Sequence, residues 1–274
     1  MTTSIANGLQ LDFCVGKAAL IVAGQATHLS MDYLLLLSSI VLGAVTVFGF
    51  KLYDARHIKL LNAFTGAYLL SLTFLHLLPE LYHHEAGHDD HGSNAALLIG
   101  GFMLAGFFVQ VALDVISMGI EHGHSHALHG KMPFGVVAGL CLHAFVEAMA
   151  LGDGHNHHDQ SSRRMLLVSI VVHNYPVAIA LLGMLLQSGM KRGRAIGVLL
   201  LFAAMAPLGM FISAHTPLAN YSRELMAIVI GIFMHISTTI LFEASDVHRF
   251  NFAKLAAILF GTALGVGSVL LFTH

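Results

Sequence analysis

The sequence contains two apolar segments that carry the same polar pattern, His143-Ala-Phe-Val-Glu147-Ala-Met-Ala-Leu151 and His173-Asn-Tyr-Pro-Val-Ala-Ile-Ala-Leu181. Aligned on their histidines, both segments have alanine five and seven positions later and leucine eight positions later. Each lies in an apolar run long enough to cross a bilayer, where ionisable side chains are costly and usually functional. We therefore expect the two segments to form helices that pack together and hold a metal ion between them.

The composition is typical of an integral membrane protein. Of the 274 residues, 56% are hydrophobic and 10% are charged, whereas about a quarter of the residues in a soluble domain are charged. A net charge of −2 gives no indication of a nucleic-acid partner, and the two cysteines form no CxxC metal site. The 20 histidines are the unusual feature. The expected partners are therefore the lipid bilayer and a divalent metal ion, with a second copy of the chain in a homodimer as an option.

The apolar segments have the length of membrane-spanning helices. None shows the strict alternation of a lipid-facing strand, and at about 20 residues per span they account for most of the chain. We therefore predict an all-α membrane protein, with an external tail at residues 1–30 and a single eight-helix domain at 31–274. The predicted spans are Met31–Phe50, Leu61–Leu81, Ala95–Ser117, Pro133–Gly152, Met165–Gln187, Ala195–Ala214, Arg223–Phe242 and Phe252–Phe272.

Basic residues in the loops indicate the orientation of the spans, because such residues accumulate on the cytoplasmic side. If the loops after the first, third, fifth and seventh spans face the cytoplasm, nine of the 13 lysines and arginines lie there. Arg163 and Arg164 form the local exception. Both termini then lie outside, and we expect a plasma membrane, with a bacterial inner membrane favoured.

His143 and Glu147 are four residues apart and therefore share one face of their helix. Together with His173 they offer two imidazoles and a carboxylate, a set that suits Zn²⁺ and also Fe²⁺, Mn²⁺ or Cd²⁺. Three protein ligands leave a coordination position open, and a transported ion must leave as readily as it enters. The simpler alternative is a buried His–Glu hydrogen bond or a proton relay without metal. We expect no prosthetic group.

Further polar residues lie near the ends of other spans. His76 and Glu80 stand four residues apart in the second span, and the predicted orientation puts them at its external end, where they could accept an ion. Asp114, at the inner end of the third span, would form a cytoplasmic exit with Glu243 and His248 beyond the seventh span. Solvated helix ends are the alternative at both places.

Three histidine-rich tracts lie in predicted loops. The loop at 118–132 is predicted to be cytoplasmic, whereas the tracts at 83–91 and 153–159 are predicted to be external. Histidine-rich tracts are typical of metal binding, and the alternative is a flexible polar linker. The predicted metal-binding residues of the cytoplasmic loop are His122, His124, His126 and His129.

In combination, these segments resemble the ZIP (Zrt/Irt-like) family of metal transporters. His143–Gly152 is similar to the family's fourth-span motif, Val172–Pro176 to its fifth-span motif and Phe74–Glu80 to its second span. The resemblance covers about residues 31–272. It implies eight spans, external termini, a histidine-rich cytoplasmic loop, and an inverted repeat that relates spans 1–3 to spans 6–8 around a central pair.

By position, the resemblance implies that His143, Glu147 and His173 are the metal ligands. Asn174 stands where family members often have a carboxylate. Many bacterial members hold two adjacent metals, using an asparagine after the fourth-span histidine and a bridging glutamate in the fifth span; here these positions are Ala144 and Val177. The resemblance therefore implies a single metal site through which a divalent ion, with zinc favoured, is imported into the cytoplasm.

Three other functions compete with transport. An intramembrane metalloprotease would need HExxH, but alanine follows His143 and asparagine follows His173, so an enzyme is not expected. A membrane metal sensor would bind the ion without carrying it. A haem-binding electron carrier would have as its axial ligands His76, His143, His173 and His235.

Overall fold

The computed structural model describes residues 31–50, 55–83, 92–117, 134–152, 160–243 and 252–272. The chain separates into two units, Met1–Leu35 and Leu36–His274. Of the first unit only residues 31–35 are described, as the start of a helix. The predicted tail at 1–30, the loop at 118–132 and the tract at 153–159 therefore lie outside the described residues.

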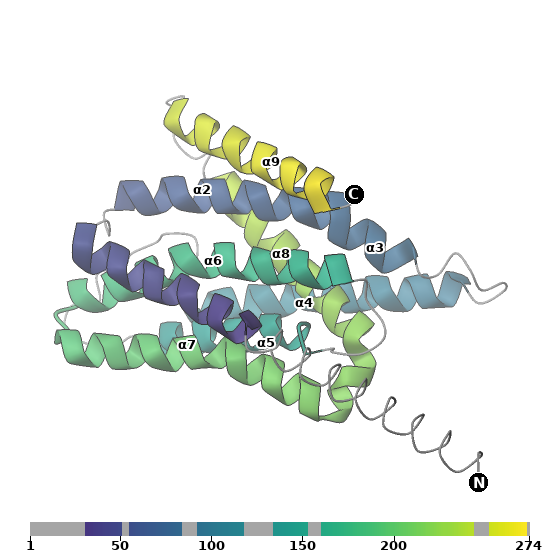
Figure 1. The fold of residues 1–274 in the computed structure, drawn as a ribbon, viewed down its shortest axis with the longest axis horizontal. Coiled ribbons are helices and arrows are strands. Elements are labelled where there is room, and N and C mark those ends of the chain that lie inside the picture. Colours follow the sequence, from purple (N-terminus) through teal and green to yellow (C-terminus); the bar gives the residue numbers. More distant parts are fainter. Residues whose placement is uncertain are drawn as a thin grey trace, which may run out of the picture. The chain divides into compact units, whose positions relative to one another are not determined.

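Apart from short turns, the described residues are helical, with no strand among them, and the prediction of an all-α membrane protein is confirmed (Figure 1). Seven of the described helices are long and apolar enough to cross a membrane, and α5, with 16 residues, is shorter. The helical segments are Met31–Phe50, α2 (Ala55–Leu72), η1 (Thr73–Leu77), α3 (Leu78–His83), α4 (Gly92–Ser117), α5 (Phe134–Met149), α6 (Gln160–Gln187), α7 (Arg192–His215), η3 (Pro217–Tyr221), α8 (Ser222–Glu243) and α9 (Phe252–Phe272).

The helices of the second unit pack in two groups. In the first group, α2 packs against α9 and α8, and α4 packs against α8 (Figure 1). In the second group, α5 packs against α7. The helical residues 36–50 contact α6, where Thr46 Oγ1 lies 3.0 Å from the hydroxyl of Tyr175. A continuous aliphatic core joins residues 36–50 to α5, α6 and α7.

This pairing agrees with the inverted repeat that the resemblance implies. The repeat exchanges spans 1, 2 and 3 with spans 6, 7 and 8, and it exchanges the two central spans with each other. This exchange pairs α2 with α8 and α4 with α9, so it converts the α2–α9 contact into the α8–α4 contact. It also pairs α5 with α6 and the first span with α7, so it converts the α5–α7 contact into the contact between α6 and residues 36–50. All four contacts are present. These contacts support the inverted repeat. It stays a prediction, because a pattern of contacts is not a superposition of the two halves.

Glycines let the helices of the first group approach backbone to backbone. A Cβ atom on Gly261 of α9 would overlap the carbonyl oxygen of Phe64 on α2, and one on Gly231 of α8 would overlap that of Met103 on α4. Gly265, one turn after Gly261, also faces α2. The Gly261-x-x-x-Gly265 pattern predicts a tight crossing, and the structure confirms it.

The second span contains a π-helical turn directly before a proline. In η1 the N–H of Leu78 donates to the carbonyl oxygen of Thr73, five residues earlier. Pro79 follows and has no N–H to donate, and a π-helical turn is one of the ways in which a helix accommodates such an interruption. His76 lies within this turn and is buried, whereas Glu80 in α3 is half-buried.

The glycine contact of α9 gives a matched test of helix packing. Gly261→Ala should lower the melting temperature of the purified protein, because the added methyl group forces α9 away from α2 and such overpacking costs about 1–3 kcal/mol. Gly267→Ala on the same helix is the control, since its added methyl group would meet no described atom within 4 Å apart from its chain neighbours and the backbone of its own helix. Thermal unfolding in detergent measures both. Equal melting temperatures for the two variants would contradict the close crossing.

Candidate metal site

Three buried side chains of metal-ligand type converge between α5 and α6. One ligand atom from each of His143, Glu147 and His173 lies within 4.8 Å of the others. The imidazole rings of the two histidines meet edge to face, with centroids 5.5 Å apart. Tetrahedral zinc ligands at about 2 Å from the ion are about 3.3 Å from one another, so small side-chain rotations would close the set around one ion.

The local structure of α5 brings two of these side chains together. His143 and Glu147 are one helical turn apart, and Nε2 of the imidazole lies 3.6 Å from Oε2 of the carboxylate. The turn that follows α5 is held by α6, because Nε of Arg163 donates to the carbonyl oxygen of Leu151 at 3.3 Å. One face of α5 packs closely against α7, where Gly209 of α7 lies against the carbonyl oxygen of Phe145. The short helix is thus fixed by its neighbours.

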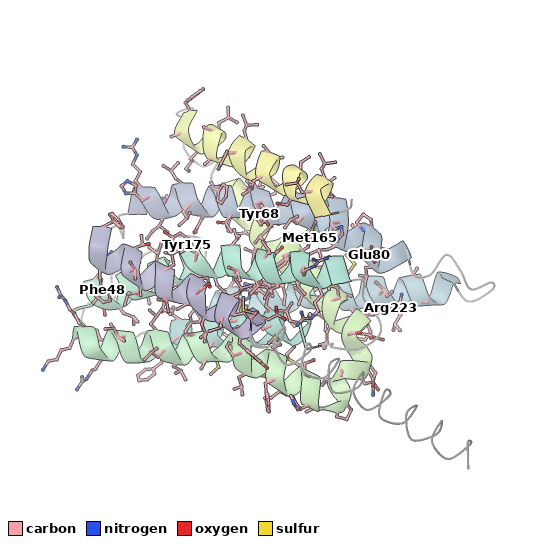
Figure 2. The ribbon with its side chains drawn as sticks, in the orientation of Figure 1. Phe48, Tyr68, Glu80, Met165, Tyr175 and Arg223 are labelled. Atoms are coloured by element: carbon pink, nitrogen blue, oxygen red, sulfur yellow. The ribbon has the colours of Figure 1, made fainter. Side chains whose placement is uncertain are left out.

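The third side chain is supplied by α6, which remains helical from Gln160 to Gln187 although Pro176 lies inside it. His173 precedes this proline by three residues. Between them lies Tyr175, which is labelled in Figure 2. Its hydroxyl group contacts Oγ1 of Thr46, so α6 is linked to the helical residues 36–50 two residues after His173.

The burial of these polar groups is unusual for an apolar helix bundle. His143 and Glu147 have no exposed surface, and His173 is 2% exposed. Asn174 is also fully buried, and within the described residues neither polar atom of its side-chain amide has a hydrogen-bond partner. A buried polar group without a partner costs about 1–3 kcal/mol. Buried polar groups without partners are expected where those groups bind a ligand.

Sequence reasoning missed one residue at this site. Gln110 of α4 is fully buried, and its Oε1 lies 3.0 Å from Nδ1 of His143. The available signal was a glutamine in the middle of an apolar span, where polar side chains are expensive. The prediction rested instead on histidines and acids, the residue types that bind metal directly.

Asp114, predicted at the exit, pairs with a histidine of another span. Its Oδ2 lies 2.9 Å from Nε2 of His235 on α8. The edge of Phe107 packs on the same imidazole, with ring centroids 4.9 Å apart. This contact between α4 and α8 is separate from the cluster on α5 and α6.

His76 and Glu80 do not join the central cluster. Among the described residues, only one group of three or more His, Cys, Asp or Glu side chains brings its ligand atoms together, and it contains neither His76 nor Glu80. The side chain of Glu243 is not described. The other predicted residues outside the described part of the chain are His122, His124, His126, His129 and His248.

The ring geometry disfavours a haem held by the two central histidines. Bis-imidazole ligation places the porphyrin plane between two rings. The rings of His143 and His173 meet edge to face at a centroid distance of 5.5 Å, and a carboxylate oxygen of Glu147 lies near both, an arrangement that suits one ion shared by three ligands better than a macrocycle between two rings.

The model of the family described as ZIP zinc transporters matches residues 121–268, which is more than half of the 274 residues. The chain belongs to this family. The predicted family resemblance is thereby confirmed, and the matched region includes both α5 and α6. The family is one of transporters rather than enzymes. Together with the apolar helices, membership shows that the chain is an integral multi-pass membrane protein.

Individual ZIP proteins show the same relationship. The chain is 28% identical to zinc transporter ZIP9 of Xenopus tropicalis over 168 residues, which are 56% of this chain and 55% of that protein. It is 29% identical to zinc transporter ZIP9-B of Xenopus laevis over 171 residues, 60% of this chain and 55% of the relative. The chain spans about half the length of the curated relatives it matches. These relatives are vertebrate proteins and give no support to a bacterial membrane.

Zinc should stabilise the folded protein through the central cluster. A ligand at one hundred times its Kd stabilises a protein by about 2.7 kcal/mol, so excess zinc should raise the melting temperature of the wild type. Glu147→Gln should abolish this rise, because it removes the only carboxylate of the cluster. Without metal the variant should stay folded, because glutamine has nearly the shape of glutamate and carries no charge that must be buried.

The control for this measurement replaces the four histidines of the loop at 118–132. With alanine at His122, His124, His126 and His129, the zinc-induced rise in melting temperature should persist. A rise that is lost in the loop variant and kept in Glu147→Gln would mean that the stabilising metal binds elsewhere.

Proposed function

We propose that this ZIP family member imports a divalent transition metal ion, with zinc as its favoured substrate, through a single site on α5 and α6. The observation that carries the proposal is the buried cluster of His143, Glu147 and His173 in a chain of this family. The relatives named above are described as zinc transporters, which supports the choice of ion.

The donor atoms account for the selection of a transition metal. Two imidazole nitrogens and one carboxylate suit borderline ions such as Zn²⁺, whereas Mg²⁺ and Ca²⁺ prefer sites made of oxygen ligands. With neutral histidines, Glu147 contributes one negative charge to offset the charge of the ion in an apolar surrounding. The amide oxygen of Asn174 is the proposed further donor, because this buried side chain has no hydrogen-bond partner among the described residues.

The neighbouring positions support one ion rather than two. Ala144 and Val177 are 1% and 4% exposed, and neither side chain has an atom that can bind a metal. A second ion beside the first would therefore lack ligands at both positions. We propose a single ion in the site at any one time.

The proposed path runs from the external to the cytoplasmic side. His76, buried in the π-helical turn, and the half-buried Glu80 would accept the ion first. After the central site, Asp114 and the residues Glu243 and His248 would receive it, and the histidines of the loop at 118–132 would bind it last. The excess of basic residues in the alternate loops supports this direction.

Zinc uptake into proteoliposomes tests the proposed function. Wild-type protein should accumulate radioactive zinc, whereas His143→Ala and Glu147→Ala should reduce uptake at least 100-fold, because each loses one of three ligands. Ser169→Ala is the matched control: Ser169 is buried on α6, and within the described part of the chain its hydroxyl donates to the carbonyl oxygen of Met165, one turn earlier in the same helix. This variant should transport at nearly the wild-type rate.

Two results would contradict the proposal in different ways. Normal uptake by both site variants would remove the central cluster from the transport path. Zinc binding by the wild type without any uptake would favour a membrane metal sensor.

A further inference from the structure

We propose that Gln110 is a positioning residue for the metal. Its amide oxygen accepts a hydrogen bond from Nδ1–H of His143 and so keeps the imidazole proton on Nδ1. Nε2, on the side of Glu147, is then unprotonated and carries the lone pair that can bind a metal. The inference deepens the proposed function and rests on it, because it assigns to α4 a role in a site whose ligands all belong to α5 and α6.

The contacts of the two imidazole nitrogens support this assignment. Nδ1 of His143 lies 3.0 Å from Oε1 of Gln110, an oxygen that can only accept a hydrogen bond. Nε2 lies 3.6 Å from the carboxylate of Glu147 and makes no hydrogen bond within the described residues. A neutral imidazole carries one proton, so a proton on Nδ1 leaves Nε2 free to bind a metal.

Burial strengthens this preference. Both Gln110 and His143 have no exposed surface, so no bulk water competes for either nitrogen. The ring also packs edge to face on His173, which limits its rotation about the side-chain bonds. Hydrogen bonds from outside a metal's ligand set commonly fix the tautomer and orientation of a ligating histidine.

The chemistry of the acceptor is informative, because α4 offers a second example one turn later. Asp114 follows Gln110 by four residues, and its carboxylate contacts His235 at 2.9 Å. A carboxylate partner makes an imidazole a stronger ligand, whereas a neutral amide orients it without adding charge. A neutral acceptor at His143 therefore gives a site that is oriented yet weak enough to release its ion.

The position of Gln110 also connects the two groups of helices. It lies on α4, which packs on α8 in the first group, while His143 lies on α5, which packs on α7 in the second. The hydrogen bond thus crosses from one group to the other. The affinity of the site consequently depends on how α5 lies against α4.

Transport kinetics with two opposite substitutions test the proposal. Gln110→Leu removes the acceptor and should raise the KM for zinc uptake 10- to 100-fold, the usual loss when such a partner is removed. Gln110→Glu replaces the amide with a carboxylate of the same shape, so KM should fall and the maximal rate should fall with it. Ser169→Ala should change neither value. KM values for both Gln110 variants within twofold of the control would overturn the proposal.

Nitrogen NMR provides a readout that does not require transport. In ¹⁵N-histidine-labelled, metal-free protein, the signals lost in His143→Ala identify this ring and should report a protonated Nδ1. In Gln110→Leu the same ring should show a mixture of both tautomers. A protonated Nε2 in the wild type would overturn the inference. If the wild type shows the expected tautomer but takes up no zinc, the proposed function fails and the positioning role of Gln110 stands.

Discussion

A carboxylate buried among apolar helices is the constraint on which the rest of the structure depends. Glu147 has no exposed surface, and an ionised group without compensation would strongly destabilise a bundle of this kind. The two histidines that face it supply neutral donors and no positive charge of their own unless protonated. In the proposed site, a divalent cation between them would offset the charge of Glu147 and bind both imidazoles.

The surrounding helices maintain this constraint by keeping the site enclosed. The helix that carries two of the three ligands is also the shortest of the described spans. It is held along its length by α7 and α4 and at its end by Arg163. In the first group of helices, glycines form the closest contacts, as where Gly231 lies against the carbonyl oxygen of Met103. The large apolar side chains of these helices therefore lie outside the closest contacts. Exposed side chains such as Leu259 and Phe260 of α9 then face outward, where lipid replaces water as solvent.

The sequence was most informative where the decisive relation is local or repeated. Hydrophobic runs predicted every described span to within a few residues, apart from the longer start of α2. The spacing of four residues predicted that His143 and Glu147 share a face, and the internal match added His173. Contacts between distant residues were beyond such reasoning. Gln110 and His143 are 33 residues apart, and Asp114 and His235 are 121 apart, so only the packing of α4 on its neighbours brings them together. Pro79 likewise predicts an interruption of the helix, but it does not predict the π-helical hydrogen bond from Leu78 to Thr73.

Helix α4 provides a neutral hydrogen-bond partner to one histidine and a carboxylate to another. Its neutral amide contacts His143, a member of the central cluster, and its carboxylate contacts His235, which lies outside that cluster. Had the order been reversed, Asp114 would bring a second negative charge to the cluster beside Glu147. That charge would hold a divalent ion more firmly and slow its release, whereas transport needs binding that is both selective and brief. In the proposed mechanism, the neutral amide at position 110 therefore favours release of the ion as well as its capture.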